Sequence, residues 1–151
     1  MITSRVCVVA MIAATLVAAT AASVSARQTT PATVGQDAKS PDSGSVLDRV
    51  FSLSQARRGE QSFSKVCASC HSARDFVGRK FAGSRAGTTF GDLALLLSET
   101  MPESAPGSLA PEEYASIIAF FLRESGYPEG EHDLPSDLPA LMKIWIEPAA
   151  T

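Results

Sequence analysis

The chain has 151 residues, with 13 basic and 16 acidic side chains and a formal net charge of −3. This length suits one compact domain, and the acidic balance argues against proteins that bind nucleic acid through a basic domain. The charge is uneven, because basic side chains dominate the domain up to Arg85, whereas only Arg123 and Lys143 accompany the many Asp and Glu residues after it. Such an asymmetry is usually a solvated surface, but it can also orient a binding partner during encounter.

Residues 1–26 have the pattern of a secretory signal peptide. Arg5 supplies the positive start, residues 6–22 form the apolar stretch, and residues 24–26 are a small-residue cleavage site. We therefore expect export, with cleavage after about Ala26. The apolar stretch is near the short limit for a membrane span, so an uncleaved anchor is the alternative, and only in that case do we expect contact with a membrane.

Residues 27–44 are predicted to be a flexible polar leader. They contain prolines, glycines and polar side chains without hydrophobic periodicity. Cleavage of the signal would remove Cys7 and leave 151 − 26 = 125 residues. Cys67 and Cys70 would then be the two cysteines of the exported chain, within a domain expected over residues 45–148.

A first helix is predicted to begin after Ser52. Ser52 as N-cap and Gln55 three residues later have the pattern of a capping box. Small and apolar residues then recur at three- and four-residue steps and mark one buried face; they are Ala56, Gly59, Phe63 and Val66. Glycine costs about 1 kcal/mol of helix propensity relative to alanine, so Gly59 indicates the close approach of another helix, which we expect to be the last one.

Cys67-Ala-Ser-Cys70-His71 follows directly, and this is the pattern to which a c-type haem is attached. On one helical turn, residues i and i+3 share a face. Cys67 and Cys70 can therefore each form a thioether with one haem vinyl group. His71 comes next on the same turn and can bind the iron as a neutral imidazole. The motif predicts one covalently bound haem, with His71 as its proximal ligand.

Three other interpretations use the same residues. A zinc site needs four ligands and would have to add His132 to the motif, although adjacent Cys70 and His71 rarely bind one metal together. A thioredoxin-like redox pair needs a preceding strand in a βαβ unit, whereas the sequence before Cys67 favours helix. A structural disulfide would leave the neighbouring histidine as a coincidence. Haem attachment accounts for all the residues of the motif.

The segment between His71 and Thr88 is predicted to be a loop. It is rich in glycine and in basic side chains, which include Arg74, Arg79, Lys80 and Arg85. Most of these side chains are expected on a solvated surface. An arginine close to a haem could instead pair with one of its two propionates through charge-assisted hydrogen bonds, and the sequence does not indicate which arginine this would be.

A second helix is predicted from about Thr89 to Thr100, ending where Pro102 removes a backbone donor. Four of its residues are available for burial: Phe90, Leu93, Leu96 and Leu97. Met101 follows, 101 − 71 = 30 residues after His71. Methionine is more often a core filler than a ligand, but Met101 lies at a helix end before a loop of proline and glycine. We expect it to be the distal iron ligand, in preference to Met142 of the apolar tail.

The last helix of the domain is predicted to begin with Pro111, followed by acidic residues that suit the positive end of a helix, and to stop near Gly126. Its apolar face comprises Tyr114, Ile117, Ile118 and Phe121. Phe120 and Phe121 are expected to pack across Gly59 and Phe63. The tail up to residue 148 is too apolar to be free and is expected to wrap around the domain.

With these motifs in place, residues 45–148 resemble a class I c-type cytochrome, and more narrowly a branch of small exported bacterial cytochromes. The resemblance rests on residues 45–51, 55–60, 67–71, 89–93, 101–109, 114–120, 126–130 and 146–148. It implies a small all-α domain wrapped around one covalent haem c, with thioethers at Cys67 and Cys70, His71 as proximal ligand and Met101 as distal ligand.

Three departures from the family accompany this resemblance. Ser72 follows the haem histidine where glycine is usual, and the Pro-Leu segment that normally supplies a hydrogen-bond acceptor for that histidine is missing. Arg85 lies near the place of an expected tryptophan. All three changes concern the potential of the haem more than the kind of function.

The resemblance implies a periplasmic electron carrier rather than an enzyme. Its partners would be redox proteins, such as a dehydrogenase that contains pyrroloquinoline quinone or a terminal oxidase. Three alternatives stay open: a fixed haem subunit of such a quinoprotein dehydrogenase, a haem gas sensor, and a small oxygen-active haem enzyme. A sensor needs an open position on the iron, so a distal methionine disfavours it.

Overall fold

The computed structural model of the chain describes residues 44–148, which form a small helical domain. The helices are α1 (Leu53–Ser62), its π-helical continuation η2 (Phe63–Cys67), α2 (Arg79–Arg85), α3 (Phe90–Thr100), α4 (Pro111–Glu124) and α5 (Leu138–Leu141), with short 3-10 turns η1 (Val46–Asp48) and η3 (Ala73–Asp75). No helix in this part of the chain is both long and apolar enough to span a membrane. The predictions for the signal peptide, residues 1–26, and for residues 27–43 of the leader lie outside the described residues.

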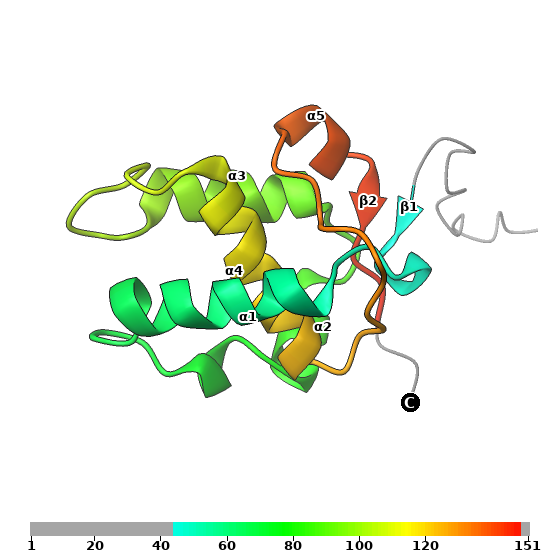
Figure 1. Cartoon of the computed structure of the whole chain (residues 1–151), viewed down its shortest axis with the longest axis horizontal. Coiled ribbons are helices and arrows are strands. Elements are labelled where there is room, and N and C mark those ends of the chain that lie inside the picture. The colour runs from blue at the N-terminus through cyan, green and yellow to red at the C-terminus, as the bar shows by residue number, and fades with distance from the viewer. Residues whose placement is uncertain (1–43, 149–151) are drawn as a thin grey trace, which may run out of the picture. The chain divides into compact units, whose positions relative to one another are not determined.

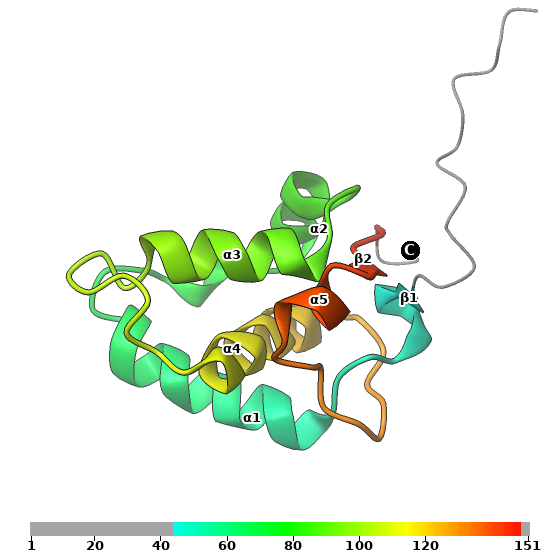
Figure 2. The ribbon, with the colours of Figure 1, turned by 90° about the horizontal axis from the view of Figure 1, so that it is seen from above.

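Helix α4 is the centre of this domain and lies between α1 and α3 (Figures 1 and 2). Every residue from Tyr114 to Leu122 is buried. The sequence pattern predicts one apolar face, and that prediction is too narrow. Because α1 packs on one side of α4 and α3 on another, the small residues between its large apolar ones, such as Ser116 and Ala119, are covered as well.

The predicted close approach at Gly59 is confirmed. A Cβ atom at this position would overlap the carbonyl oxygen of Ser116 and lie 2.9 Å from the backbone nitrogen of Ile117. One turn later, the ring of Phe63 lies 5.6 Å from that of Phe120 and 5.7 Å from that of Phe121. Helices α1 and α4 therefore meet backbone to backbone at the glycine and ring to ring beyond it.

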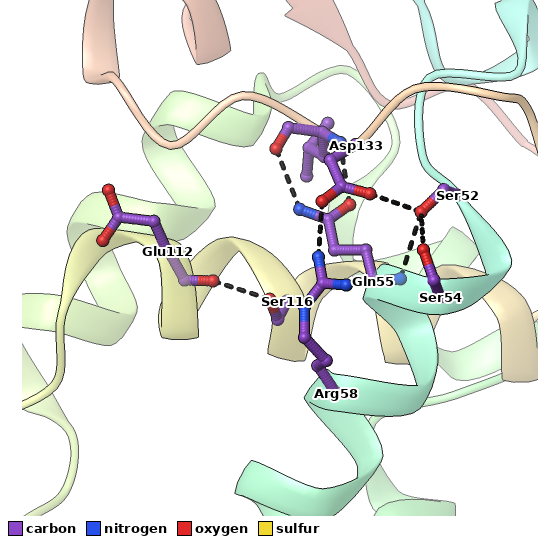
Figure 3. A network of polar contacts seen from close by, with 8 residues as sticks. Ser52, Ser54, Gln55, Arg58, Glu112, Ser116 and Asp133 are labelled. Atoms are coloured by element: carbon purple, nitrogen blue, oxygen red, sulfur yellow. Dashed lines mark hydrogen bonds and ion pairs between the residues drawn. The ribbon is translucent and has the colours of Figure 1, made fainter.

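The start of α1 is capped as predicted, but the capping box is not formed. The Ser52 hydroxyl accepts a hydrogen bond from the Gln55 N–H at 3.0 Å. The Gln55 amide does not return to Ser52; it donates to the Leu134 carbonyl at 2.9 Å and accepts from the Leu134 N–H at 2.7 Å. The Asp133 carboxylate accepts from both Ser52 and Arg58 (Figure 3). These bonds attach the tail to the first turn of α1.

The loop predicted between His71 and Thr88 is in part wrong, since this segment contains η3 and the seven-residue helix α2. Phe81 of α2 is buried, and its ring packs edge-on against Tyr127 at 6.1 Å. The burial of one aromatic residue in a segment of glycine and basic residues leaves little periodicity in the sequence. Helix α2 therefore depends on the packing of Phe81 against Tyr127 rather than on a local sequence pattern.

The apolar tail wraps the domain as predicted, although not all of it is covered. Leu134, Leu141 and Ile146 are buried, whereas the side chains of Leu138 and Trp145 are 39% and 38% exposed. The tail also forms strand β2 (Ile144–Trp145), which pairs in parallel with β1 (Gly44–Ser45). The sequence predicts no strands, and it assigns Gly44 to the leader. Gly44 instead pairs with Ile144.

We predict that Gly59→Ala destabilises the protein by about 1–3 kcal/mol or more, because the added methyl group meets the backbone of α4 and cannot be relieved by a side-chain rotation. Gly83→Ala is the matched control. Gly83 lies within α2. Apart from its chain neighbours and the backbone of its own helix, no atom of residues 44–148 comes within 4 Å of the place that a Cβ atom would take there, so alanine should stabilise the helix by up to about 1 kcal/mol. Urea unfolding of both variants measures the difference, and equal midpoints would contradict the packing described at Gly59.

Candidate cofactor site

A cavity of about 490 Å³ is lined by all four residues that the sequence predicts as haem-binding: Cys67, Cys70, His71 and Met101. The first three come from the end of η2 and the turn after it, and Met101 follows the last residue of α3. Helix α4 contributes Tyr114, Ile117 and Phe121 to the lining. The fold therefore brings Met101 to the same cavity as the motif, although the two are far apart in the sequence.

The walls of this cavity are mostly apolar. Its apolar lining residues are Phe63, Val66, Phe76, Leu96, Leu97, Pro102, Leu109, Ile117 and Phe121. One of these residues, Leu96 of α3, has 40% of its surface exposed to solvent. The volume lies within the range of about 300–1,000 Å³ that is typical of small-molecule and cofactor sites. Size, apolar walls and the set of donor atoms all fit a haem held by two thioethers and two axial ligands.

The turn that carries the motif is helical, as predicted. The Cys67 carbonyl accepts hydrogen bonds from the Cys70 N–H at 3.1 Å and from the His71 N–H at 3.0 Å. Just before it, the Ala68 N–H donates to the Phe63 carbonyl at 3.0 Å, which is the i to i+5 bond of a π-helix. Short π-helical segments of this kind are frequent at functional sites. Here the segment ends at the first cysteine of the motif.

The two cysteines differ in their surroundings, and both are free thiols in the structure. Cys67 is half-buried, and burial raises the pKa of its thiol. Cys70 is exposed and also belongs to the lining of the cavity. The two thiols of the motif therefore differ in their exposure to solvent, although they line the same cavity.

His71 is oriented by ring packing. Its imidazole is half-buried and lies edge-on to the ring of Phe76 at 5.2 Å. Phe76 in turn stacks on Phe121 of α4, with ring centroids 5.6 Å apart. Within residues 44–148, no group forms a hydrogen bond with the imidazole. Ring contacts therefore link His71 to the core through Phe76 and Phe121, and the sequence analysis does not identify Phe76.

Both backbone polar groups of Met101 form hydrogen bonds. Its N–H donates to the Leu97 carbonyl at 2.8 Å, and its carbonyl accepts from the Tyr114 hydroxyl at 2.7 Å. The sequence predicts Tyr114 only as a residue of the apolar face. A buried tyrosine hydroxyl usually finds a hydrogen-bond partner, and this is the signal that could have pointed to a second role.

Met142 occupies a different environment. A Cβ atom at Gly91 would overlap its side chain, and its sulfur accepts a hydrogen bond from the Thr89 hydroxyl at 3.4 Å. Met142 is not among the residues that line the cavity, and neither is His132. Of the two methionines in the described part of the chain, Met101 thus lies in the lining of the cavity and Met142 does not.

The other interpretations of the motif find no geometric basis. Among the residues that the structure describes, no group of three or more His, Cys, Asp or Glu side chains is placed to hold a metal ion, so the zinc set of Cys67, Cys70, His71 and His132 is not assembled. Helix rather than strand precedes Cys67, against a thioredoxin-like pair. Both cysteines are free, against the disulfide.

Comparisons with models of protein families, with curated proteins and with solved structures gave no match. The likeness to class I cytochromes therefore stays a prediction from the sequence motifs.

We predict that Tyr114→Phe costs about 0.5–1.5 kcal/mol, the net value of one hydrogen bond, and loosens the loop that Met101 begins. Tyr127→Phe is the matched control, since the Tyr127 hydroxyl donates to the Glu147 carbonyl at 2.7 Å in the tail. Both variants should lose similar stability in urea. Only Tyr114→Phe should speed hydrogen exchange at the amides of Ala105 and Ser108, and unchanged exchange there would contradict the role given to Tyr114.

Proposed function

We propose that this protein is a mono-haem c-type cytochrome that carries single electrons between redox proteins in the periplasm. The observation that supports the proposal most strongly is that Cys67, Cys70, His71 and Met101 line one apolar cavity of about 490 Å³. The periplasmic location rests on the signal-peptide pattern of residues 1–26. The expected partners are a quinoprotein dehydrogenase, a terminal oxidase or proteins of that kind.

Each residue has a definite task in this proposal. Cys67 and Cys70 hold a haem c by two thioethers, His71 supplies a neutral nitrogen to the iron, and Met101 supplies a soft sulfur. Such a haem supplies one iron that gains and loses a single electron between Fe(III) and Fe(II). Because Met/His ligation and apolar surroundings favour the less charged, reduced iron, we expect a potential higher than that of a haem without the methionine.

Packing of the ligands suits electron transfer better than substrate chemistry. Phe76 and Phe121 restrain His71 from one side, while Tyr114 and Leu97 restrain the backbone of Met101. Ligands that keep their places in both redox states need little rearrangement when the electron moves. An enzyme or a gas sensor needs an open iron position, and Met101 would occupy it. A fixed haem subunit of a dehydrogenase would use the same site.

The direct test is to express the full chain together with a cytochrome c maturation system. We expect one haem per chain that stays with the protein after denaturation, seen by mass spectrometry and by absorbance. Replacing Cys67 and Cys70 by alanine should abolish this attachment and give a poorly folded, protease-sensitive chain, because a small domain loses much of its core with the cofactor.

Cys7→Ala is the control for this test, since the residue belongs to the predicted signal and should not affect attachment. The proposal fails if the unchanged chain carries no covalent haem. It also fails if the double cysteine variant keeps the haem or folds cooperatively with normal stability.

A second prediction separates the two methionines. Met101→Ala should keep the covalent haem but open the iron to added cyanide or carbon monoxide and lower its potential, because the soft sulfur ligand is lost. Met142→Ala should do neither, since Met142 packs against Gly91. Redox titrations and ligand-binding spectra of both variants check this. An unchanged spectrum and potential in Met101→Ala would contradict the assignment of Met101.

A further inference from the structure

We propose that Arg85 binds a propionate group of the haem, an inference that rests on the function proposed above. Haem carries two propionates, which are carboxylates in water near neutral pH. A carboxylate that lies at the edge of an apolar cavity needs a cation or several hydrogen-bond donors to offset its lost hydration. A haem in this cavity would therefore need a cation or hydrogen-bond donors beside its propionates.

Arg85 is the basic residue in the lining of the cavity, as far as residues 44–148 are concerned. The other basic side chains of the same segment are placed differently. Arg74 and Arg79 are exposed and are not part of the lining, and Lys80 forms an ion pair with Asp75 at 3.6 Å. Of the four basic residues Arg74, Arg79, Lys80 and Arg85, Arg85 is the one that lines the cavity.

The environment of Arg85 lacks the partner that a guanidinium group usually has. The residue is half-buried beside apolar walls, and no acidic side chain of the described residues lies within ion-pair distance of it. Glu103 lines the same cavity without forming an ion pair with Arg85. A guanidinium offers two parallel N–H donors that match a carboxylate, so a propionate supplies the missing partner.

The backbone of Arg85 is also well anchored. Its carbonyl accepts from both the N–H of Thr88 at 3.1 Å and the hydroxyl of Thr88 at 2.8 Å. The next residues are tied to the tail, because Gly87 donates to the Ile146 carbonyl and Ile146 donates to the Thr88 carbonyl, each at 2.9 Å. Since Ile146 is fully buried, the side chain of Arg85 extends toward the cavity from a fixed position.

A guanidinium at a propionate has two consequences for the holoprotein. It favours the ionised carboxylate, so the propionate pKa falls. Its positive charge also disfavours the additional positive charge of oxidised iron, so it raises the potential. Loss of the cation should therefore lower the potential where the propionate is ionised. As the pH falls and the propionate becomes neutral, the potential should rise again, which produces a pH-dependent step.

The test is a redox titration of the haem-loaded protein between about pH 5 and pH 9 for the unchanged chain, Arg85→Gln, Arg85→Lys and Arg79→Gln. A neighbouring opposite charge lowers a carboxyl pKa by about 1 to 3, so Arg85→Gln should change the propionate ionisation constant by tenfold or more. Arg85→Lys keeps the charge but loses the paired donors, so it should show a smaller change in the same direction. Arg79→Gln removes the same charge from an exposed position of α2 and serves as the matched control.

Three results would overturn the inference. If Arg85→Gln and Arg79→Gln have the same potential at every pH, Arg85 acts only through net charge, while the covalent haem in these samples would still support the proposed function. If Glu103→Gln, added to Arg85→Gln, abolishes the pH-dependent step, the titrating partner of Arg85 is Glu103 rather than a propionate. A chain without covalent haem overturns both the inference and the proposed function.

Discussion

The contact on which the rest of the structure depends is the one between Gly59 of α1 and the backbone of α4 at Ser116. It allows the two helices to approach more closely than any side chain would permit. One turn further, this approach brings Phe63 against Phe120 and Phe121, and four residues after Phe63 the helix reaches Cys67. The position of the first cysteine relative to α4 is therefore a consequence of a glycine two turns earlier.

Helix α4 contacts both segments that supply the predicted iron ligands of the candidate site. On one side, Phe121 supports Phe76 and, through it, the ring of His71. On the other, the Tyr114 hydroxyl holds the carbonyl of Met101. Tyr114 and Phe121 are seven residues apart, or about two helical turns, so one helix face supports both predicted axial ligands. The apolar lining between them is what a flat apolar cofactor requires.

The C-terminal tail is hydrogen-bonded to two separate parts of the domain. Leu134 is bonded to Gln55 in the first turn of α1, and Asp133 is bonded to Arg58 in the second turn (Figure 3). Ile146 is bonded to the segment after Arg85. One apolar segment thus restrains both the start of the helix that leads to the motif and the arginine of the cavity. Its role is structural, and it acts through side-chain and backbone hydrogen bonds between residues that are far apart in the sequence.

Local patterns were enough to predict helices α1, α3 and α4, the cap at Ser52 and the turn of Cys67, Cys70 and His71, because each depends on residues within a few positions of one another. Helix α2, the bonding of Gln55 to Leu134, the support of Met101 by Tyr114 and the place of Arg85 were not predictable in this way. Each of these is decided by a partner tens of residues away or by burial against another element. The sequence by itself determined which atoms are available for the proposed chemistry, and only the tertiary structure decided that they face one cavity, because packing against α4 sets their distances.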